Sequence, residues 1–291
     1  MIFLGGSGLV GSRLRAVWAR DAEILAPTHT ELDVLDAKAL EAFIASAQSD
    51  SVVNLAAWAD VDGAEPERGD TRGVVYRLNV EFPRQLARLC AQTGKHLVHI
   101  STDYVFDGVN AEKPYSEEDQ TAPLCWYAQT KRDGEVAIQG VDPTACIARI
   151  EMPYTAARHA KRDLARLVAT RLSEGQTVQG VTDQRITPVL LDDAAAAVRK
   201  LAEARYSGVV HVAASDWTTP YDFARGIARR LKLEEDCVLP VEFAQFAVTR
   251  PALRPQHSWL DVTRFANVFG DAILKPVDEA LDMWSRQWRL P

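Results

Sequence analysis

Cysteine is scarce in this sequence of 291 residues, and its spacing excludes a disulfide scaffold. No two cysteines form a CxxC pair, and none stands at metal-ligand spacing from a histidine. The six histidines show no such spacing among themselves. We therefore expect no metal site, and reduced thiols as in a cytoplasmic protein. The cysteines are Cys90, Cys125, Cys146 and Cys237.

Positive charge is also in short supply. Lysine and arginine together number 33 against 40 acidic residues, and the net charge is -7. No basic cluster interleaved with aromatic residues occurs, so we expect no nucleic-acid partner. No apolar run approaches the length of a membrane span, and the N-terminal stretch "MIFLGGSGLVG" lacks the basic start of a secretion signal. We expect no association with a membrane.

Short apolar runs alternate with helical patterns through the first half of the chain. Such runs between amphipathic helices are typical of βαβ units around a parallel sheet. The sequence therefore predicts an α/β protein with a Rossmann-like doubly wound parallel sheet, which binds ligands beyond the carboxyl ends of its strands. The expected strands are 2–4, 23–26, 51–57, 96–101 and 145–150, and the expected helices are 9–20, 37–47, one ending near Thr93 and one carrying Tyr127.

The less regular second half predicts a smaller lobe. Residues 1–150 are expected to form a dinucleotide-binding Rossmann domain, with segments near 176–214 returning to it. Residues 151–291 are expected to form mainly a C-terminal substrate-binding lobe, interleaved with the first domain because no flexible linker separates them. The expected strands are 177–181 and 208–214, and the expected helices are 160–174, 190–204, 219–232 and 275–288.

A glycine-rich turn follows the first expected strand. Gly5, Gly8 and Gly11 form the pattern GxxGxxG, in which glycines permit a tight turn and the close approach of a pyrophosphate. The next helix, which starts with Leu9 and Val10, would point its free N–H groups at that phosphate. A merely structural turn is the alternative, but the strand–turn–helix context favours a dinucleotide site.

The end of the second expected strand bears on the choice of dinucleotide. An acidic residue there would bind the ribose 2′-hydroxyl and select NAD. The first polar residues are instead Thr28, His29 and Thr30, which would not repel a 2′-phosphate. The sequence therefore favours NADPH and leaves NADH open, because no arginine is placed to grip that phosphate. Asp33 is expected near the adenine.

Tyr127 stands four residues before Lys131, so on a helix the two side chains share a face. A nearby lysine favours the phenolate and lowers the pKa of the tyrosine, which makes Tyr127 a candidate proton donor or acceptor. Ser101 and Thr102, at the carboxyl end of the fourth expected strand, can face the same site and bond a carbonyl oxygen. The alternatives are a surface helix and an ordinary turn. The order of the glycine turn, the hydroxyls and the Tyr-Lys pair argues against coincidence.

Four stretches carry a resemblance to a known family: "GGSGLVG", "NLAAWADVDGAE", "STDYVFDG" and "PYSEEDQTAPLCWYAQTK". The sequence resembles the extended short-chain dehydrogenases/reductases and, within them, the dTDP-4-dehydrorhamnose reductase family. "HISTDYVFDG" followed by the pattern PLxxYxxTK is specific to that branch. "DQRITPVLLDDAA" and "RPQHSWLDVTR" match its C-terminal half, so the resemblance covers nearly the whole chain.

The resemblance implies a role for each candidate residue. Tyr127 would protonate the C4 oxygen of a nucleotide-linked 4-keto-6-deoxysugar as hydride arrives from NADPH. Lys131 would lower the pKa of Tyr127 and bind the nicotinamide ribose, and Thr102 would polarise the ketone. Asp103 and Tyr104 would lie against the sugar. The cofactor site would comprise Gly5, Gly8, Leu9, Val10, Gly11, Asp33, Ala56, Ala57, Trp58, Tyr127 and Lys131.

Some positions depart from the pattern of the family. Met152 stands where the family has a tryptophan near the sugar, and Glu151 precedes it. Ala59 replaces a threonine after the third expected strand. These positions concern the sugar and not the hydride chemistry, so they bear on which keto-sugar is used. Arg185 is a candidate grip for a phosphate of the nucleotide, with an ordinary surface arginine as the alternative.

Two other functions stay open. One is a related nucleotide-sugar epimerase or dehydratase, although a dehydratase usually has an Asp-Glu pair beside the catalytic threonine. Here Thr102 is followed by Asp103 and Tyr104, so the pair is incomplete in the sequence. The other is a regulatory subunit that binds NADP without turnover. A homodimer is also open, and so is the magnesium ion that some relatives use at a dimer contact.

Overall fold

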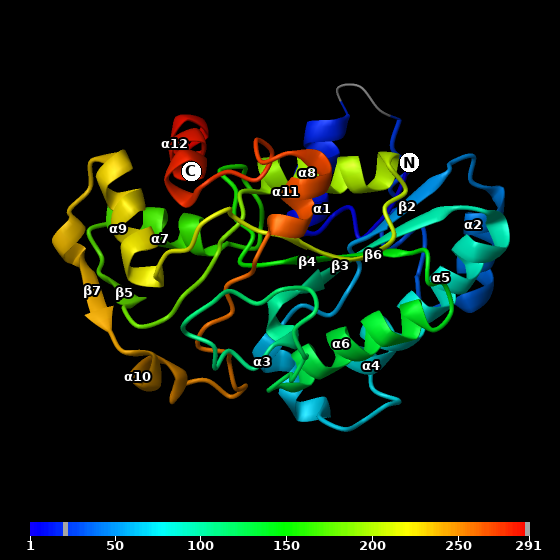
Figure 1. Cartoon of the computed structure of the whole chain (residues 1–291), viewed down its shortest axis with the longest axis horizontal. Coiled ribbons are helices and arrows are strands. Elements are labelled where there is room, and N and C mark those ends of the chain that lie inside the picture. Colours follow the sequence, from blue (N-terminus) through cyan, green and yellow to red (C-terminus); the bar gives the residue numbers. More distant parts are fainter. Residues whose placement is uncertain (20–22, 289–291) are drawn as a thin grey trace.

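The molecule is built around a five-stranded sheet with the strand order β1-β2-β3-β4-β6 (Figure 1). A computed structural model describes residues 1–19 and 23–288. Every neighbouring pair of strands in this sheet is parallel, which confirms the predicted Rossmann-like architecture. The strands are β1 (Ile2–Leu4), β2 (Ser51–Asn54), β3 (His96–Thr102), β4 (Cys146–Ile150) and β6 (Gly208–Val212).

The prediction of an extended strand at 23–26 is wrong. Only Leu25 pairs there, through a parallel bridge to Ile2. Pro27 follows almost at once and has no N–H group to continue a ladder. The strand expected at 51–57 also ends early, because the Asn54 side chain accepts a hydrogen bond from the Ala56 N–H at 3.0 Å and turns the chain. The expected end of the first helix at Arg20 lies outside the described residues.

Helices cover both faces of the sheet, as a doubly wound fold requires. Phe3 and Val98 face the α1, α8 and α11 side, whereas Val52 and Leu97 face the α2, α5 and α6 side. Successive residues of a strand point to opposite faces, so continuous apolar runs fill both halves of the core. These helices are α1 (Leu9–Trp18), α2 (Ala37–Ser46), α5 (Phe82–Thr93), α6 (Trp126–Gln139), α8 (Leu191–Glu203) and α11 (Thr263–Phe269).

The helix expected to end near Thr93 contains a π-helical turn just before α5. Pro83 lacks the N–H that would bond the Asn79 carbonyl, and the chain widens into the π turn there. The freed carbonyl of Asn79 faces α6, where a Cβ added to Gly134 would lie 2.1 Å from it. Gly134 therefore lets α6 pack closely on this turn. The preceding elements are α3 (Val61–Ala64), the 3-10 turn Glu65–Glu67, α4 (Val74–Tyr76) and the π turn Arg77–Glu81.

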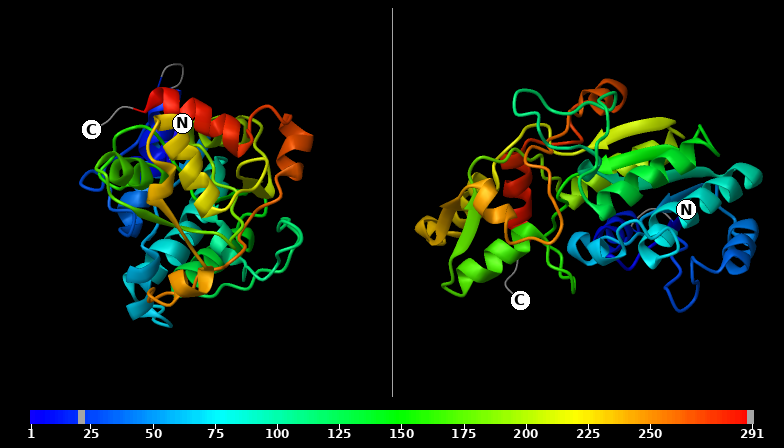
Figure 2. Two further views of the ribbon diagram at one scale, coloured as in Figure 1. Left: turned by 90° about the vertical axis from the view of Figure 1, so that its left-hand side faces the viewer. Right: turned by 90° about the horizontal axis from the view of Figure 1, so that it is seen from below.

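A smaller lobe lies beside the main sheet, and the right view of Figure 2 shows it at the left of the molecule. Its core packs Tyr154, Phe223 and Trp284 together. The strand expected at 177–181 belongs to this lobe and does not return to the main sheet, because it pairs with a strand from the C-terminal third of the chain. The elements are α7 (Leu164–Ser173), β5 (Val178–Val181), α9 (Pro220–Leu231), β7 (Val238–Val241), α10 (Phe243–Ala247) and α12 (Val277–Gln287).

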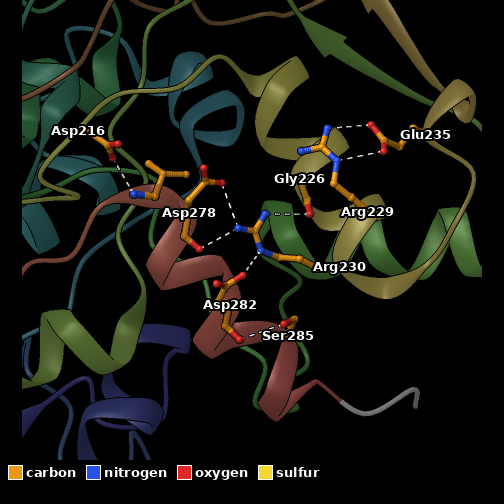
Figure 3. Close-up of polar contacts among 9 residues, drawn as sticks. Asp216, Gly226, Arg229, Arg230, Glu235, Asp278, Asp282 and Ser285 are labelled. Carbon is orange, nitrogen blue, oxygen red and sulfur yellow. Dashed lines mark hydrogen bonds and ion pairs between the residues drawn. The ribbon is translucent and has the colours of Figure 1, made fainter.

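Ion pairs fasten the last helix of the lobe to its neighbour. Arg230 of α9 reaches Asp278 at 3.1 Å and Asp282 at 2.6 Å on α12 (Figure 3). The Asp216 carboxylate accepts the Val277 N–H at 2.7 Å at the start of α12. Both partners of Arg230 are exposed, so each pair is worth only about 0.2–1 kcal/mol. The apolar core therefore stabilises this lobe, and the ion pairs fix the register of α12 on α9.

Candidate active site

The carboxyl ends of the parallel strands place the predicted site residues along one edge of the sheet. The glycine turn follows β1, and Ala56 and Trp58 follow β2. Asp103 follows β3, and Glu151 follows β4. Since ligands of such sheets bind beyond this edge, the fold brings together most of the residues predicted from the sequence.

The glycine turn is as tight as its sequence predicts. Gly5 has a φ of 85°, and a Cβ there would lie 2.5 Å from the Ala56 nitrogen. A Cβ on Gly11 would lie 2.5 Å from the Gly5 carbonyl oxygen. Gly8 precedes α1, whose first turn has no acidic side chain and no side-chain cap. The first N–H groups of α1, at Leu9 and Val10, therefore suit a phosphate.

A cleft of about 480 Å³ opens beside this turn. It runs from Gly5 and Gly8 past Asp33 to Ala56 and Ala57, and its volume lies in the range of cofactor-binding clefts. Leu9, Val10 and Gly11 belong to the same turn but do not line the cleft.

Gly11→Ala is expected to weaken NADPH binding by about tenfold or more, because the new methyl group meets backbone atoms of the turn that cannot move aside. Fluorescence titration of the folded variant measures this. Gly140→Ala is the matched control, since Gly140 has an ordinary φ of -69° at the end of α6, away from the turn. A Gly11→Ala variant that is folded and binds NADPH like the wild type would contradict the assignment of the turn.

Trp58 is held by an asparagine that the sequence did not single out. Asn79, fully buried in the π turn, accepts the Trp58 N–H at 2.9 Å and donates to the Trp58 carbonyl at 3.2 Å. Its amide also donates to Thr130 of α6 at 3.0 Å. Asn79 thus joins the segment after β2 to α6. An asparagine inside an apolar helical stretch was the only signal of this role.

Tyr127 and Thr102 meet at the centre of the edge. Tyr127 stands in the first turn of α6, close enough to the Thr102 hydroxyl at the end of β3 for a hydrogen-bonding influence on its pKa. The Tyr104 ring packs edge-on against Tyr127, with the ring centroids 6.0 Å apart. Burial raises the pKa of Tyr127 above its ordinary value, although the hydrogen bond with Thr102 opposes this. This direction is opposite to the lowered pKa expected from the sequence.

Lys131 lies under Tyr127, but its ammonium group is bound to β3. Its Nζ donates to the Ile100 carbonyl at 2.7 Å and lies 3.3 Å from His99 Nε2. Burial lowers the pKa of Lys131 to about 8, and the charge of Glu135 acts against this lowering. Burial is the largest influence on the pKa of Tyr127, and this explains why the lowering expected from Lys131 is missing.

His99 and Asn54 form a second group that sequence reasoning missed. Because Asn54 Oδ1 accepts the Ala56 N–H, its amide nitrogen faces His99 Nδ1 at 3.0 Å. These bonds assign the histidine proton to Nε2, which points at Lys131. An Nε2–H facing an ammonium would set two donors against each other, so the arrangement favours a neutral lysine. The sequence shows only a histidine inside an apolar strand, and the contact depends on the pairing of β2 with β3.

Two acidic side chains lie at the same edge. Asp103 and Glu151 are both buried, and the Thr102 hydroxyl donates to Asp103 Oδ1 at 3.0 Å. Met152 is half-buried beside them with a φ of 37°, a left-handed conformation that is unfavourable for a residue with a side chain. The strained backbone at Met152 directs the chain away from the end of β4.

Arg185 is not an ordinary surface arginine. Its guanidinium lies over the rings of Trp217 and Trp259, 4.6 and 4.9 Å from their centroids. It also donates to the Ala111 carbonyl. These contacts tie the loop after β3 to the smaller lobe, and a role for Arg185 in binding a phosphate stays a prediction.

Metal ligands do not gather anywhere in the described residues, where no group of three or more histidine, cysteine, aspartate or glutamate side chains could hold an ion. Within residues 1–19 and 23–288, no helix is long and apolar enough to cross a membrane. The four cysteines are free thiols.

A parallel sheet with a glycine turn after its first strand, and with threonine, tyrosine and lysine at its carboxyl edge, defines a short-chain dehydrogenase/reductase of the extended type. A family model described as the RmlD substrate binding domain matches residues 1–285, and the chain belongs to this family.

Named relatives and solved structures agree with this assignment. A dTDP-4-dehydrorhamnose reductase of Mycobacterium tuberculosis (strain H37Rv) is 37% identical over 272 residues, covering 91% of this chain and 86% of the relative. A probable dTDP-4,6-dihydroxy-2-methyloxan-3-one 4-ketoreductase of Streptomyces antibioticus is 35% identical, covering 91% and 87%. The crystal structure of a dTDP-4-dehydrorhamnose reductase from Clostridium acetobutylicum superposes with a TM-score of 0.86 at 26% identity, covering 97% of both chains.

Proposed function

We propose that this protein reduces the 4-keto group of a nucleotide-linked 4-keto-6-deoxysugar, with dTDP-4-dehydro-L-rhamnose as the best-supported substrate and dTDP-L-rhamnose as the product. The observation that carries the proposal is the meeting of Thr102 and Tyr127 above Lys131, beyond the cleft of the glycine turn. The named relatives, which reduce 4-keto sugars according to their names, support the choice of substrate.

NADPH, when bound along the glycine turn and the cleft, supplies the hydride. The acidic side chains near the cleft do not select NADH, because Asp33 Oδ1 is already engaged by the Leu35 N–H at 3.0 Å and is not free for a ribose 2′-hydroxyl. The carboxylate of Glu31, the first acidic residue after Thr28, is likewise engaged by the Thr28 N–H at 2.7 Å. We therefore propose NADPH as the preferred donor and expect NADH to be used less well.

The state of Tyr127 suits a reduction. A buried phenol whose pKa is raised keeps its proton at neutral pH, so Tyr127 is a general acid and not a base in the resting protein. We propose that Thr102, whose hydroxyl is close enough to influence the pKa of Tyr127, orients the phenol toward the ketone. Lys131 donates to the Ile100 carbonyl, and we propose that it also binds the nicotinamide ribose when NADPH is present.

The identity of the product tests the proposal against its nearest rivals. With NADPH and dTDP-4-dehydro-L-rhamnose, a reductase forms one alcohol for each NADPH consumed, which chromatography and NMR of the product detect. A dehydratase or epimerase consumes no NADPH, and a regulatory subunit binds NADPH without turnover. A cytoplasmic location and a homodimer remain predictions from the sequence.

Met152→Trp is expected to lower the KM for dTDP-4-dehydro-L-rhamnose, because an indole at this position would stack on the sugar. The positive φ of Met152 is no obstacle specific to tryptophan, since methionine already adopts it. Steady-state kinetics measure the effect, with Val109→Trp on an exposed loop as the control. An unchanged KM would mean that the side chain at position 152 does not contact the sugar.

A further inference from the structure

The register of β3 and β4 brings two carboxyl groups together beside Thr102. Thr102 pairs with Ile150 at the ends of these strands, so the next residues, Asp103 and Glu151, emerge side by side. Asp103 is 3% exposed and Glu151 is fully buried. Neither carboxyl forms an ion pair with any residue in the described part of the chain. Two buried carboxylates without a cation cannot both be ionised at neutral pH, so the pair holds a proton.

The donors around each carboxyl indicate which one holds this proton. Glu151 accepts from the Thr187 N–H at 2.8 Å, from the Thr187 hydroxyl, and from the Ser258 hydroxyl at 2.7 Å. Three donors favour the ionised form of Glu151.

The far oxygen of Asp103 completes this assignment. Asp103 Oδ2 is buried and has no hydrogen-bond partner among residues 1–19 and 23–288. An ionised oxygen without a donor is costly in a buried site, whereas a protonated oxygen carries no charge that needs one. The lack of a donor at Oδ2 therefore favours the protonated form of Asp103.

A row of hydroxyl groups connects Asp103 to Tyr127. The Thr102 hydroxyl donates to Asp103 Oδ1 at 3.0 Å, so its oxygen accepts from the Tyr127 hydroxyl with which it is bonded. The Tyr104 N–H also donates to Thr102 Oγ1, at 3.2 Å, and holds the hydroxyl in place. The row therefore runs from Tyr127 through Thr102 to Asp103, which follows β3 beside Glu151.

We propose that Glu151 keeps Asp103 as a neutral carboxylic acid, and that Asp103 returns through Thr102 the proton that Tyr127 gives to the ketone oxygen. The proposal rests on the reductase function proposed above. It assigns Glu151, at one of the positions that depart from the family pattern, as a positioning residue for this proton.

The proton balance is simple. Tyr127 loses its hydroxyl proton to the ketone oxygen as the hydride reaches the carbon, and becomes a phenolate. The Asp103 carboxyl turns its protonated oxygen toward Thr102, gives its proton to Thr102 Oγ1, and Thr102 gives its own hydrogen to the phenolate. Asp103 is then ionised beside Glu151, which is unfavourable. Asp103 regains one proton from the solvent when the site opens. The net reaction consumes one proton for each ketone reduced.

Other charges around the pair do not disturb this assignment. The titratable groups that face Asp103 are Glu151 from β4, Tyr127 from α6 and Tyr104 on its own segment. Arg254 faces Tyr104 but is paired with Asp62 at 2.8 Å. Burial, followed by the charge of Glu151, raises the pKa of Asp103 well above its ordinary value, and burial raises the pKa of Glu151 to about 7.

Infrared spectroscopy of the protein without cofactor or substrate tests the first half of the proposal. The carbonyl band of a protonated carboxylic acid is expected at neutral pH in the wild type, shifted by ¹³C-labelling of aspartate and absent in Asp103→Asn. In Glu151→Gln the pH at which this band disappears is expected to fall by about one unit or more, because the neighbouring charge is gone. Glu117→Gln is the matched control, since its carboxyl is also buried but is bonded to the His211 N–H.

Two outcomes of this spectroscopy would overturn the proposal. One is the lack of an aspartate band that depends on Asp103 at neutral pH, and the other is an unchanged midpoint in Glu151→Gln. If Glu151→Gln does not fold, Ser258→Ala replaces it. Removing this donor makes the Glu151 carboxylate less stable, so the aspartate band is expected to weaken and a glutamate band to replace it, and an unaltered aspartate band would contradict the proposal.

The pH dependence of turnover tests the second half. With NADPH and the keto-sugar, kcat is expected to fall on the alkaline side at the pH where the aspartate band disappears, and Glu151→Gln is expected to move both together. A band that shifts while the kcat profile stays fixed would overturn the proton return. If the wild type does not reduce the sugar, the proposed reductase function is wrong. The spectra of the free protein still show whether Asp103 is protonated beside Glu151.

Discussion

Replacing Tyr127 with phenylalanine is expected to lower kcat for the keto-sugar by about 10²–10⁴-fold, the usual contribution of a positioned general acid. The phenol lies where α6 begins, close enough to Thr102 at the end of β3 for that hydroxyl to influence its pKa. Its ring packs against Tyr104, and phenylalanine keeps that contact. We therefore expect NADPH affinity to stay within a few fold of the wild type, as measured by fluorescence titration.

Tyr76→Phe is the matched control for this substitution. Tyr76 stacks on Trp126 with centroids 6.3 Å apart and belongs to the same part of the molecule, but it has no contact with Thr102. Its loss should leave kcat nearly unchanged. A Tyr127→Phe variant with wild-type turnover would show that another group protonates the ketone oxygen.

Removing Glu135 is expected to lower the free energy of unfolding by about 3–5 kcal/mol, because it leaves a buried arginine without its partner. Arg149 of β4 donates to Glu135 of α6 through two bonds of 3.0 and 2.7 Å, and both side chains are about 5% exposed or less. The guanidinium also lies 5.1 Å from the centre of the Phe106 ring. This pair fixes α6, and with it Tyr127 and Lys131, against the sheet.

Urea unfolding of Glu135→Ala at neutral pH measures this effect. The control is Glu203→Ala, which removes the exposed partner of Arg199 at the end of α8 and should cost less than about 1 kcal/mol. Equal and small losses for the two variants would contradict a structural role of the buried pair. Because Glu135 opposes the lowering of the Lys131 pKa, its removal should also make Lys131 lose its proton more readily.

The parts of the fold that depend on local pattern could be predicted from the sequence. The glycine turn, the apolar strands and the Tyr-Lys spacing are each contained in a few consecutive residues, and the structure places them as expected. The strand at 23–26 could not be predicted well, because its pairing is limited by Pro27 and by a single bridge to Ile2. The place of 177–181 also depends on a partner, β7, some 60 residues away in the chain.

The electrostatics of the site could not be read from spacing. A lysine four residues after a tyrosine predicts a lowered phenol pKa, but burial acts more strongly and raises it. Burial also lowers the pKa of Lys131. Burial depends on the tertiary structure, which the spacing of residues in the sequence does not reveal. The meeting of Asp103 with Glu151 had a signal, since each follows directly on a buried strand, but only the register of β3 on β4 makes them neighbours.

The most direct test of the account is NADPH oxidation, followed by absorbance, with dTDP-4-dehydro-L-rhamnose made in situ from dTDP-glucose. A reaction with NADH and a blank without sugar run beside it. The account predicts rapid turnover with NADPH, slower turnover with NADH, and dTDP-L-rhamnose as the product. NADPH binding without any oxidation in the presence of the keto-sugar would contradict the proposed reductase function, while leaving the fold and the family assignment intact.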